Sequence, residues 1–160
     1  MGGITMTIRT AQDADSAALN KLLYQVHKVH SDIRPDLFRR GSKKYDDEQL
    51  RNILADKDRP VFVAEENGAV CGYAFCIIQD NSKSASLTDI KTLYIDDLCV
   101  DESCRENGIG RKLYDYVCSF ARKIGCYNVT LNVWAGNESA EAFYRNIGMH
   151  VQKIGMEQIL

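Results

Sequence analysis

The chain has no excess of charge of either sign, since its 160 residues include 20 basic and 22 acidic side chains and give a formal net charge of −2. A small domain that binds nucleic acid as its main partner is usually clearly basic, so no nucleic-acid partner is expected. No apolar run approaches the roughly 18 to 20 residues that span a bilayer, which predicts no membrane partner. The first ten residues, MGGITMTIRT, lack the regions of a signal peptide, so a cytoplasmic location is expected.

Metal-ligand spacing is also missing from the sequence. The six cysteines include no C-x-x-C pair, and the three histidines do not cluster with them. In a cytoplasmic chain these thiols are expected to be reduced, and several lie in apolar runs where cysteine behaves as a small hydrophobe. The sequence therefore predicts no metal site.

The length and the 45% hydrophobic content predict one domain over residues 1–160, large enough to bury a core. Residues 4–10 alternate apolar and polar side chains, which predicts a strand. Asp13 is expected to cap the next helix. The predicted inward face of that helix comprises Ala18, Leu19, Leu22, Leu23, Val26 and His30. Pro35 and Gly41 predict a loop, followed by a short helix over 46–54.

The second half of the chain carries clearer signals. Residues 60–78 predict two strands joined at Glu66-Asn67-Gly68, because Asn-Gly is a strong hairpin signal. A third strand is expected over 91–100 and a helix over 109–124, which Gly125 ends.

A strand is then predicted over 128–134, a helix between Asn137 and Gly148, and a strand-like tail over 150–160. The order is a strand, two helices, an antiparallel meander and then β-α-β-α-β. This is a mixed α/β fold whose sheet changes from antiparallel to parallel pairing.

The segment Arg105-Glu106-Asn107-Gly108-Ile109-Gly110 lies between a predicted strand and a predicted helix. Unpaired N–H groups at a helix N-terminus form an anion site, and glycine lets a ligand approach the backbone. Arg105, Arg111 and Lys112 add positive charge. The segment predicts a phosphorylated ligand, although a glycine-containing helix start needs no ligand.

Two common phosphate-binding motifs do not fit this segment. A P-loop requires G-x-x-x-x-G-K-[ST], and no Lys-[ST] pair follows these glycines. A dinucleotide fingerprint requires a third glycine where Leu113 stands, and it should open the first βαβ unit of the chain.

A third motif does fit. The segment matches the [QR]-x-x-G-x-[GA] pattern of the GNAT family of N-acetyltransferases, and LNVWAGNESAEAFYRNIGM is similar to the second signature of that family. The resemblance implies the GNAT fold, in which two central strands splay apart. It also implies acetyl-CoA as the donor and a primary amine as the acceptor.

The resemblance assigns cofactor contacts along the chain. The diphosphate of coenzyme A would lie on the backbone amides of Arg105 to Gly110, including Glu106, Asn107, Gly108 and Ile109, with Arg111 close by. The pantetheine arm would pair with Leu98, Cys99 and Val100 and with the strand near Asn132. The Leu98 N–H would stabilise the thioester oxyanion, a kind of interaction whose loss costs about 3 kcal/mol of barrier. Asn137 would serve either as a helix cap alone or as both a helix cap and a cofactor contact.

The resemblance also supplies catalytic candidates. Tyr144 matches the general acid of the family, although a tyrosine at this position also suits the core. A Lys-like amine has a pKa of about 10.4 and must lose a proton before it attacks. Asp96 is the predicted base and Asp97 the predicted amine anchor, although strand alternation places them on opposite faces unless a bulge intervenes. Both are alternatively a polar strand end.

The acceptor is expected near Arg34, Asp36 and Phe38 and beside Tyr94, although residues 30–41 also suit a plain surface loop. A small-molecule amine, polyamine-like or amino-acid-like, is the first hypothesis. A protein acetyltransferase is weakened because Asn132 stands where one branch of the family carries a base. A non-catalytic acyl-CoA-binding regulator is a third hypothesis. A homodimer is expected if a strand from a second copy completes the sheet.

Overall fold

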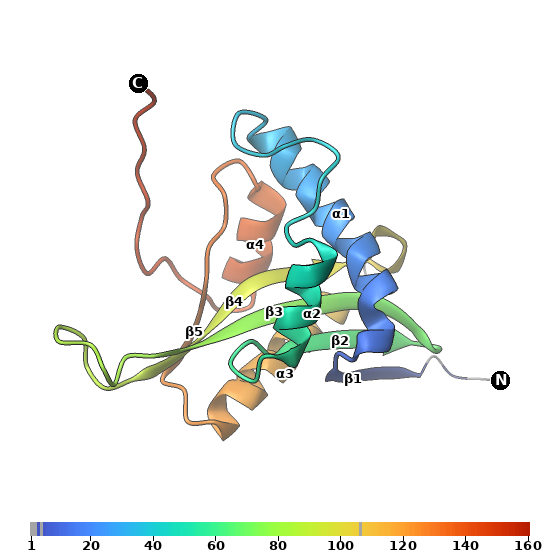
Figure 1. Cartoon of the computed structure of the whole chain (residues 1–160), viewed down its shortest axis with the longest axis horizontal. Helices are drawn as coiled ribbons and strands as arrows, with labels where there is room; N and C mark the ends of the chain where they lie inside the picture. The colour runs from blue at the N-terminus through green and yellow to red at the C-terminus, as the bar shows by residue number, and fades with distance from the viewer. Residues whose placement is uncertain (1–2, 4, 106) are drawn as a thin grey trace.

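The computed structural model describes residues 3, 5–105 and 107–160 (Figure 1). Five strands form one sheet in chain order, namely β1 (Met6–Thr10), β2 (Val61–Glu66), β3 (Ala69–Asp80), β4 (Lys91–Val100) and β5 (Asn128–Leu131). The first four are antiparallel neighbours, and β5 pairs parallel with β4. The predicted change from antiparallel to parallel pairing is confirmed.

Helices cover both faces of this sheet. A 3-10 turn η1 (Asp13–Asp15) leads into α1 (Ser16–Ile33), which packs with α2 (Asp47–Ala55) on one face. A second 3-10 turn η2 (Glu102–Cys104) precedes α3 (Ile109–Lys123), which packs on the opposite face. The last helix, α4 (Glu138–Asn146), lies next to the upper part of α1 in Figure 1.

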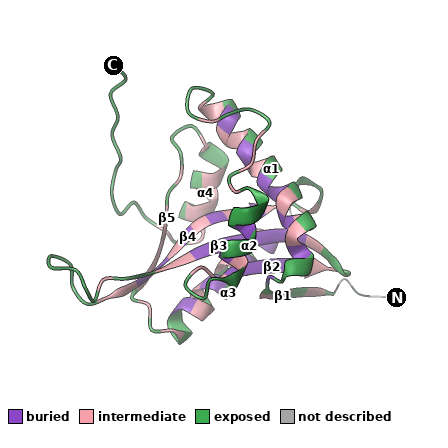
Figure 2. Cartoon of the chain, in the orientation of Figure 1, coloured by how far each residue is buried: buried purple, intermediate pink, exposed green. Residues whose placement is uncertain are grey.

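The core consists of two apolar layers separated by the sheet, because successive strand residues point to opposite faces. Tyr73 and Phe75 of β3 pack with Leu22 under α1 and α2. Ala74 of β3 packs instead with Leu113 under α3. Figure 2 shows that buried residues follow β2, β3 and β4 between these helices.

Two irregularities interrupt the strand alternation. The β2–β3 register leaves Cys71 without a partner, and the β3–β4 register leaves Asp96 without one. At a bulge of this kind, the side chain of the extra residue points to the face opposite to the one that regular strand alternation would give it. Cys71 therefore packs on the α3 face. Asp96 and Asp97 lie together on the α1–α2 face, where they bond to Tyr45 and Tyr73.

The predicted turns are confirmed. Asn67 and Gly68 have φ values of 50° and 81°, as a two-residue hairpin turn of type I′ requires. Gly125 ends α3 with φ of 80°, and Gly148 follows α4 with φ of 102°. Glycine reaches these conformations without steric cost, which makes the helix ends predictable.

Three local predictions are wrong. The first helix is not capped by Asp13, because η1 precedes it and the Asp15 carboxylate accepts the Gln12 N–H at 2.7 Å. His27 rather than His30 is buried on its inner face. β5 ends at Leu131, three residues before its predicted end.

The C-terminal arm (residues 150–160) forms no strand, contrary to the sequence prediction, and all of its residues are exposed. It runs away from the sheet (Figure 1), so its backbone has no strand to pair with. An ion pair between Glu157 and Arg34 ties it to the end of α1. No helix in the described part of the chain is long and apolar enough to cross a membrane.

Candidate active site

The turn before α3 has the backbone geometry that the sequence predicts, but its two glycines serve different purposes. Gly108 has φ of 72° and ψ of 15°, and a Cβ added there would meet nothing within 4 Å. At Gly110, an added Cβ would lie 3.3 Å from Cζ of Phe143. Glycine is therefore needed at 108 for its backbone conformation and at 110 because α4 packs closely against α3.

The N-terminus of α3 offers unpaired donors. The first bond of the helix runs from Lys112 N to Gly108 O at 3.1 Å, so the N–H groups of Ile109, Gly110 and Arg111 have no partner within the helix. Such a terminus, with the positive end of the helix dipole, favours an anion. Arg105 lies close by and donates from Nε to Val100 O at 3.3 Å.

Other parts of the predicted turn are less informative. The Arg111 guanidinium pairs with Asp115 at 3.2 Å and is exposed. Asn107 lies in the turn itself, and Glu106 lies outside the described residues. Their predicted cofactor contacts stay predictions.

The two central strands separate beside this turn. β4 pairs with β5 only from Thr92 to Ile95, opposite Asn128 to Leu131. β4 continues to Val100, so its segment from Asp96 to Val100 has no strand on that side. Leu98, Cys99 and Val100 thus lie on an open strand edge, where an extended ligand can form backbone hydrogen bonds.

Asp97 is a carboxylate in the protein interior. Its side chain is buried, and the hydroxyl of Tyr73 donates to its Oδ2 at 2.7 Å. Burial raises the pKa of Asp97 to about 6, although the Tyr73 hydrogen bond opposes the shift. This carboxyl therefore exchanges its proton close to neutral pH, as a general base must.

Asp96 has a different environment on the same face. Nζ of Lys44 lies 3.0 Å from its carboxylate and donates to its backbone oxygen at 3.1 Å. The hydroxyl of Tyr45 also donates to the Asp96 carboxylate. Arg59 donates to that hydroxyl at 3.3 Å, so Asp96 is held among cationic and phenolic groups.

Tyr144 projects from α4 toward this region. Burial raises the pKa of the Tyr144 phenol, and the negative charge of Asp97 raises it further, so the hydroxyl stays protonated. Among the described residues it has no hydrogen-bond partner, which leaves its proton available. At the start of α4, Asn137 Oδ1 accepts Ala140 N at 3.3 Å, so the predicted cap is confirmed.

The predicted acceptor residues fall into separate groups. Phe38 packs edge-on against Trp134 with ring centroids 5.3 Å apart, which joins the loop after α1 to the segment before α4. Arg34 is engaged by Asp36 at 2.7 Å and by the C-terminal arm. The Tyr94 hydroxyl accepts a hydrogen bond from Asn132 Nδ2 at 3.1 Å, so these two predicted residues do meet.

Sequence reasoning missed several side chains of this region, namely Tyr73, Tyr45, Lys44, Arg59 and Trp134. Only Tyr73 carried a usable signal. It stands at an inward position between Gly72 and Ala74, and a buried tyrosine hydroxyl usually has a hydrogen-bond partner. Lys44 and Tyr45 come from a loop whose path no sequence pattern fixes.

The described surface has two hollows, and only one of them lies away from this arrangement. One of about 480 Å³ is lined by Asp80, Lys91 and Tyr127, at the far end of β4 from Asp97. Another of about 250 Å³ lies beside Tyr45 and Arg59. The first contains none of the candidate residues, and the second borders the contacts around Asp96 but contains neither the turn nor Tyr144.

A turn with unpaired N–H donors, an open strand edge and a protonated tyrosine thus lie in one region. Residues 24–149 match the family described as Acetyltransferase (GNAT) family. The chain belongs to the GNAT family. This acetyltransferase has the GNAT fold, with the splayed central strands that the sequence predicted.

Known proteins resemble this acetyltransferase to different extents. Glucosamine 6-phosphate N-acetyltransferase of Trypanosoma brucei brucei is 29% identical over 93 residues, which span 58% of this chain and 59% of that enzyme. The BH1408 protein of Bacillus halodurans, solved as a tetramutant, is 30% identical with a TM-score of 0.91, covering 96% of this chain and 99% of that one. Aminoglycoside N-acetyltransferase AAC(6')-Iy in complex with CoA is 15% identical with a TM-score of 0.74, covering 99% and 97%, and it shows the fold alone.

Proposed function

We propose that this protein transfers an acetyl group from acetyl-CoA to a primary amine of a small molecule. The observation that carries the proposal is the open edge of β4 from Asp96 to Val100, which leads from the α3 turn to Asp97 and Tyr144. Acetyl-CoA supplies an activated acyl thioester. The Trypanosoma brucei brucei relative named above acts on an amino sugar phosphate, which supports a small amine.

The residues of the turn suit the diphosphate of the cofactor. Gly108 presents bare backbone with open space beside it, and the first N–H groups of α3 are unpaired. We assign the diphosphate to the amides from Arg105 to Gly110, with charge from Arg105 and Arg111. The extended arm pairs with Leu98, Cys99 and Val100 on one side and lies near Asn132 and Asn137 on the other.

For the base, the geometry favours Asp97 over Asp96, which reverses the roles expected from the sequence. The pKa of Asp97 is raised to about 6, so the group is ionised at neutral pH and still basic enough to accept a proton. Asp96 is held by Lys44 and Tyr45, and we assign it the positioning of the amine.

For the acid, Tyr144 donates its proton to the leaving thiolate. A raised pKa keeps the phenol protonated before the reaction. The Leu98 N–H stabilises the negative charge that develops on the thioester oxygen. The two groups act on different atoms of the thioester. Tyr144 protonates the leaving sulfur, and the Leu98 N–H stabilises the carbonyl oxygen.

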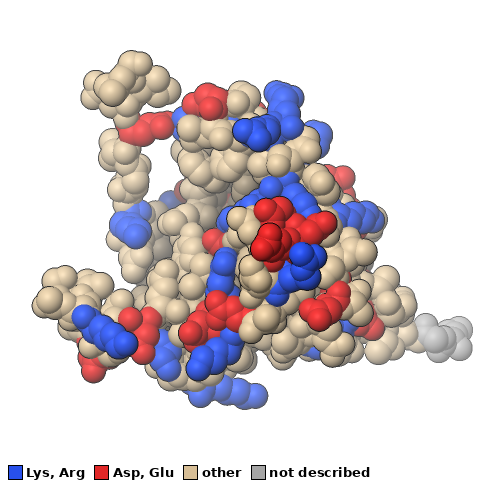
Figure 3. Space-filling model, in the orientation of Figure 1, with Lys and Arg blue, Asp and Glu red and all other residues tan. Residues whose placement is uncertain are grey.

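The acceptor lies between the α1 loop and the open strand edge. In our proposal Phe38 and Trp134 form one wall of the acceptor pocket, and Tyr94 of β4 contributes to it beside Asn132. Arg34 and Asp36 neutralise each other, so in our proposal they shape the entrance rather than bind substrate charge directly. Acidic and basic side chains are mixed on the face drawn in Figure 3, which fits a small acceptor better than a polyanion.

A homodimer is part of the proposal. The C-terminal arm exposes Ile154, Met156 and Ile159 by 77%, 88% and 77%, and the outer edge of β5 is unpaired in the described sheet. An apolar extended segment and an open sheet edge in one chain suit exchange between two copies. A cytoplasmic location is supported by the six cysteines, which are all described and form no disulfide.

Thiol release from acetyl-CoA over a panel of amino sugars, polyamines, amino acids, aminoglycosides and short peptides tests the reaction. We expect turnover with at least one small amine. Tyr144→Phe should lower kcat by about a hundredfold or more while CoA affinity, measured by calorimetry, is retained. Tyr127→Phe is the matched control, because Tyr127 is 76% exposed at the far end of β4 and should keep full activity.

Other outcomes of this panel would identify the alternatives. Turnover of peptides alone would indicate a protein acetyltransferase. CoA binding without turnover of any amine would indicate a regulator. A protein with no affinity for CoA would contradict the proposal entirely.

A further inference from the structure

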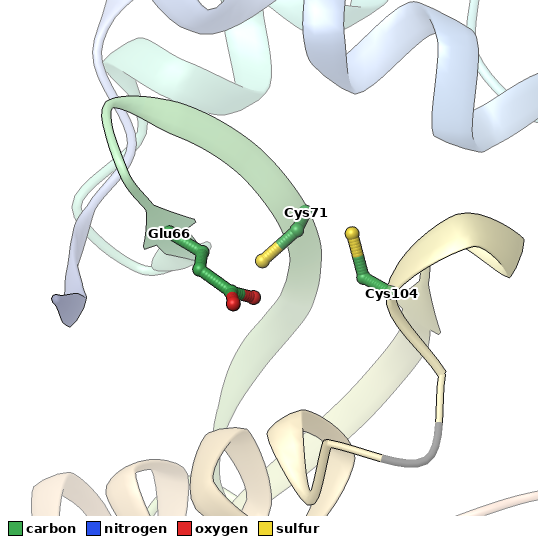
Figure 4. Close-up of side chains that lie close together, drawn as sticks. All are labelled: Glu66, Cys71 and Cys104. Carbon is green, nitrogen blue, oxygen red and sulfur yellow. The ribbon is translucent and has the colours of Figure 1, made fainter. Parts of the chain in front are cut away.

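Two thiols and a carboxylate converge outside the acetyl-transfer region. Glu66 ends β2, Cys71 lies on β3 and Cys104 ends η2, and their ligand atoms all lie within 4.8 Å of one another. Figure 4 shows the three side chains approaching one another from these three segments. Glu66 and Cys71 lie close in the sequence, across the β2–β3 hairpin, but Cys104 is distant from both, which is why ligand spacing gave no signal.

The fold places these side chains together by specific means. Cys71 is the extra residue of the β3 bulge, and without the bulge it would face α1 instead. Asp101 N donates to Cys71 O at 2.8 Å, and Cys104 N donates to Asp101 O at 2.9 Å. Backbone hydrogen bonds thus fix both cysteines relative to each other.

The charge around this cluster is not balanced by a side chain. No lysine or arginine in the described residues forms an ion pair with Glu66. Burial raises the pKa of Cys71 to about 11, and Cys104 and Glu66 contribute to the shift. The Cys71 thiol is therefore protonated in the absence of a cation, and a bound cation would displace its proton.

We propose that Glu66, Cys71 and Cys104 bind one zinc ion. Zinc takes thiolate sulfur at about 2.3 Å and carboxylate oxygen at about 2.0 to 2.2 Å, and it prefers four ligands in a tetrahedron. The three side chains need a small approach to reach these distances, and water occupies the fourth position. Two soft thiolates favour zinc over the hard cations magnesium and calcium, which take oxygen ligands.

The site is structural and lies outside the acetyl-transfer machinery. A zinc ion there fastens the hairpin of β2 and β3 to η2, immediately before Arg105. Binding releases protons and stabilises the folded chain in proportion to the zinc concentration. The proposal is therefore independent of any activity measurement.

The test measures metal directly on the reduced full-length protein. After dialysis against buffered zinc and removal of free metal, elemental analysis should give one zinc per chain. Replacement with cobalt(II) should give a thiolate-to-metal absorption band in the near ultraviolet. Cys104→Ser and Glu66→Gln should weaken zinc binding at least about tenfold.

The variants are chosen so that a folding defect cannot imitate the result. Cys104 and Glu66 are only partly buried, and circular dichroism checks that both variants fold. Cys126→Ser is the matched control, since Cys126 is also partly buried and lies at the end of α3, and it should bind zinc normally.

Three results would overturn the proposal. One is the absence of stoichiometric zinc on the reduced wild-type protein. Another is zinc binding that Cys104→Ser leaves unchanged. A third is a Cys71–Cys104 disulfide in protein purified without reductant together with no zinc binding after reduction.

Discussion

The hydroxyl of Tyr73 donates a 2.7 Å hydrogen bond to the carboxylate of Asp97 inside the protein. Both residues are buried, and Tyr73 has no exposed surface. The bond partly stabilises the carboxylate, but burial dominates and the pKa of Asp97 remains raised, at about 6. The protein therefore keeps a titratable group near neutral pH beside the open edge of β4.

The first prediction concerns the pH dependence of the reaction. If Asp97 is the base, kcat/KM should rise with pH through about 6, because only the ionised carboxylate accepts a proton. Asp97→Asn should abolish this rise of kcat/KM near pH 6 and lower kcat/KM, while Asp96→Asn should retain the rise. The acceptor amine adds a second rise at its own pKa in all three proteins. An unchanged rise near pH 6 in Asp97→Asn would assign the base elsewhere.

The second prediction concerns stability. The pKa of Asp97 is about 6 in the folded chain and 3.8 for an ordinary aspartate, so the folded state holds the proton more tightly. The contribution of Asp97 to the free energy of unfolding is therefore greatest below pH 4 and is lost as pH rises through about 6. Asp97→Asn should raise the free energy of unfolding at pH 7.5 by up to about 3 kcal/mol.

Urea denaturation at pH 4, 6 and 7.5 measures this effect. The difference in the free energy of unfolding between Asp97→Asn and the wild-type protein should decrease toward pH 4. Equal stability of the two proteins at pH 7.5 would show that the buried carboxylate is not destabilising.

The third prediction separates backbone strain from ligand binding at the α3 turn. Gly108 and Gly125 have φ values of 72° and 80°, and at both positions an added Cβ would meet nothing within 4 Å. Alanine at either position should lower the free energy of unfolding by about 1 to 2 kcal/mol, because a residue with a Cβ is strained at a positive φ. Only Gly108→Ala should also weaken CoA binding, since only Gly108 lies in the turn. Calorimetric titration with CoA compares the two, and equal affinities would remove the turn from the cofactor site.

The fourth prediction concerns the C-terminal arm. Removal of residues 150–160 should convert a dimer into a monomer, because the exposed apolar side chains and the edge of β5 lose their partners. Sedimentation velocity measures the assembly state. Leu87→Ser is the control, since Leu87 is 59% exposed outside the arm and should leave the dimer intact. A full-length protein that is monomeric at micromolar concentration would contradict the exchange.

Much of the fold could be predicted from local chemistry. Asn67-Gly68, Gly125 and Gly148 mark turns that depend only on backbone conformation, and the structure confirms them. The helix over 109–124 has a clear apolar face, and α3 matches it to within one residue. The tail was mispredicted because a strand-like sequence does not reveal whether a neighbouring strand exists to pair with it.

The parts of the candidate site that follow from sequence motifs could be predicted. The parts that depend on the pairing register of β3 and β4 could not. The position of Tyr144 and of the α3 turn follows from the sequence. The arrangement of Asp96 and Asp97 does not, because the bulge that places them on one face involves a partner strand distant in the sequence. The network of Lys44, Tyr45 and Arg59 around Asp96 is set by tertiary contacts alone.

The bulge at Asp96 affects how this chain should be compared with others. A relative without the bulge would carry its two carboxylates on opposite faces of the strand, even if its sequence also had two consecutive aspartates. An alignment without a gap at this point would equate side chains that point in opposite directions. Residue roles are therefore transferred reliably only by counting along the paired strands, starting from Phe75 opposite Asp97.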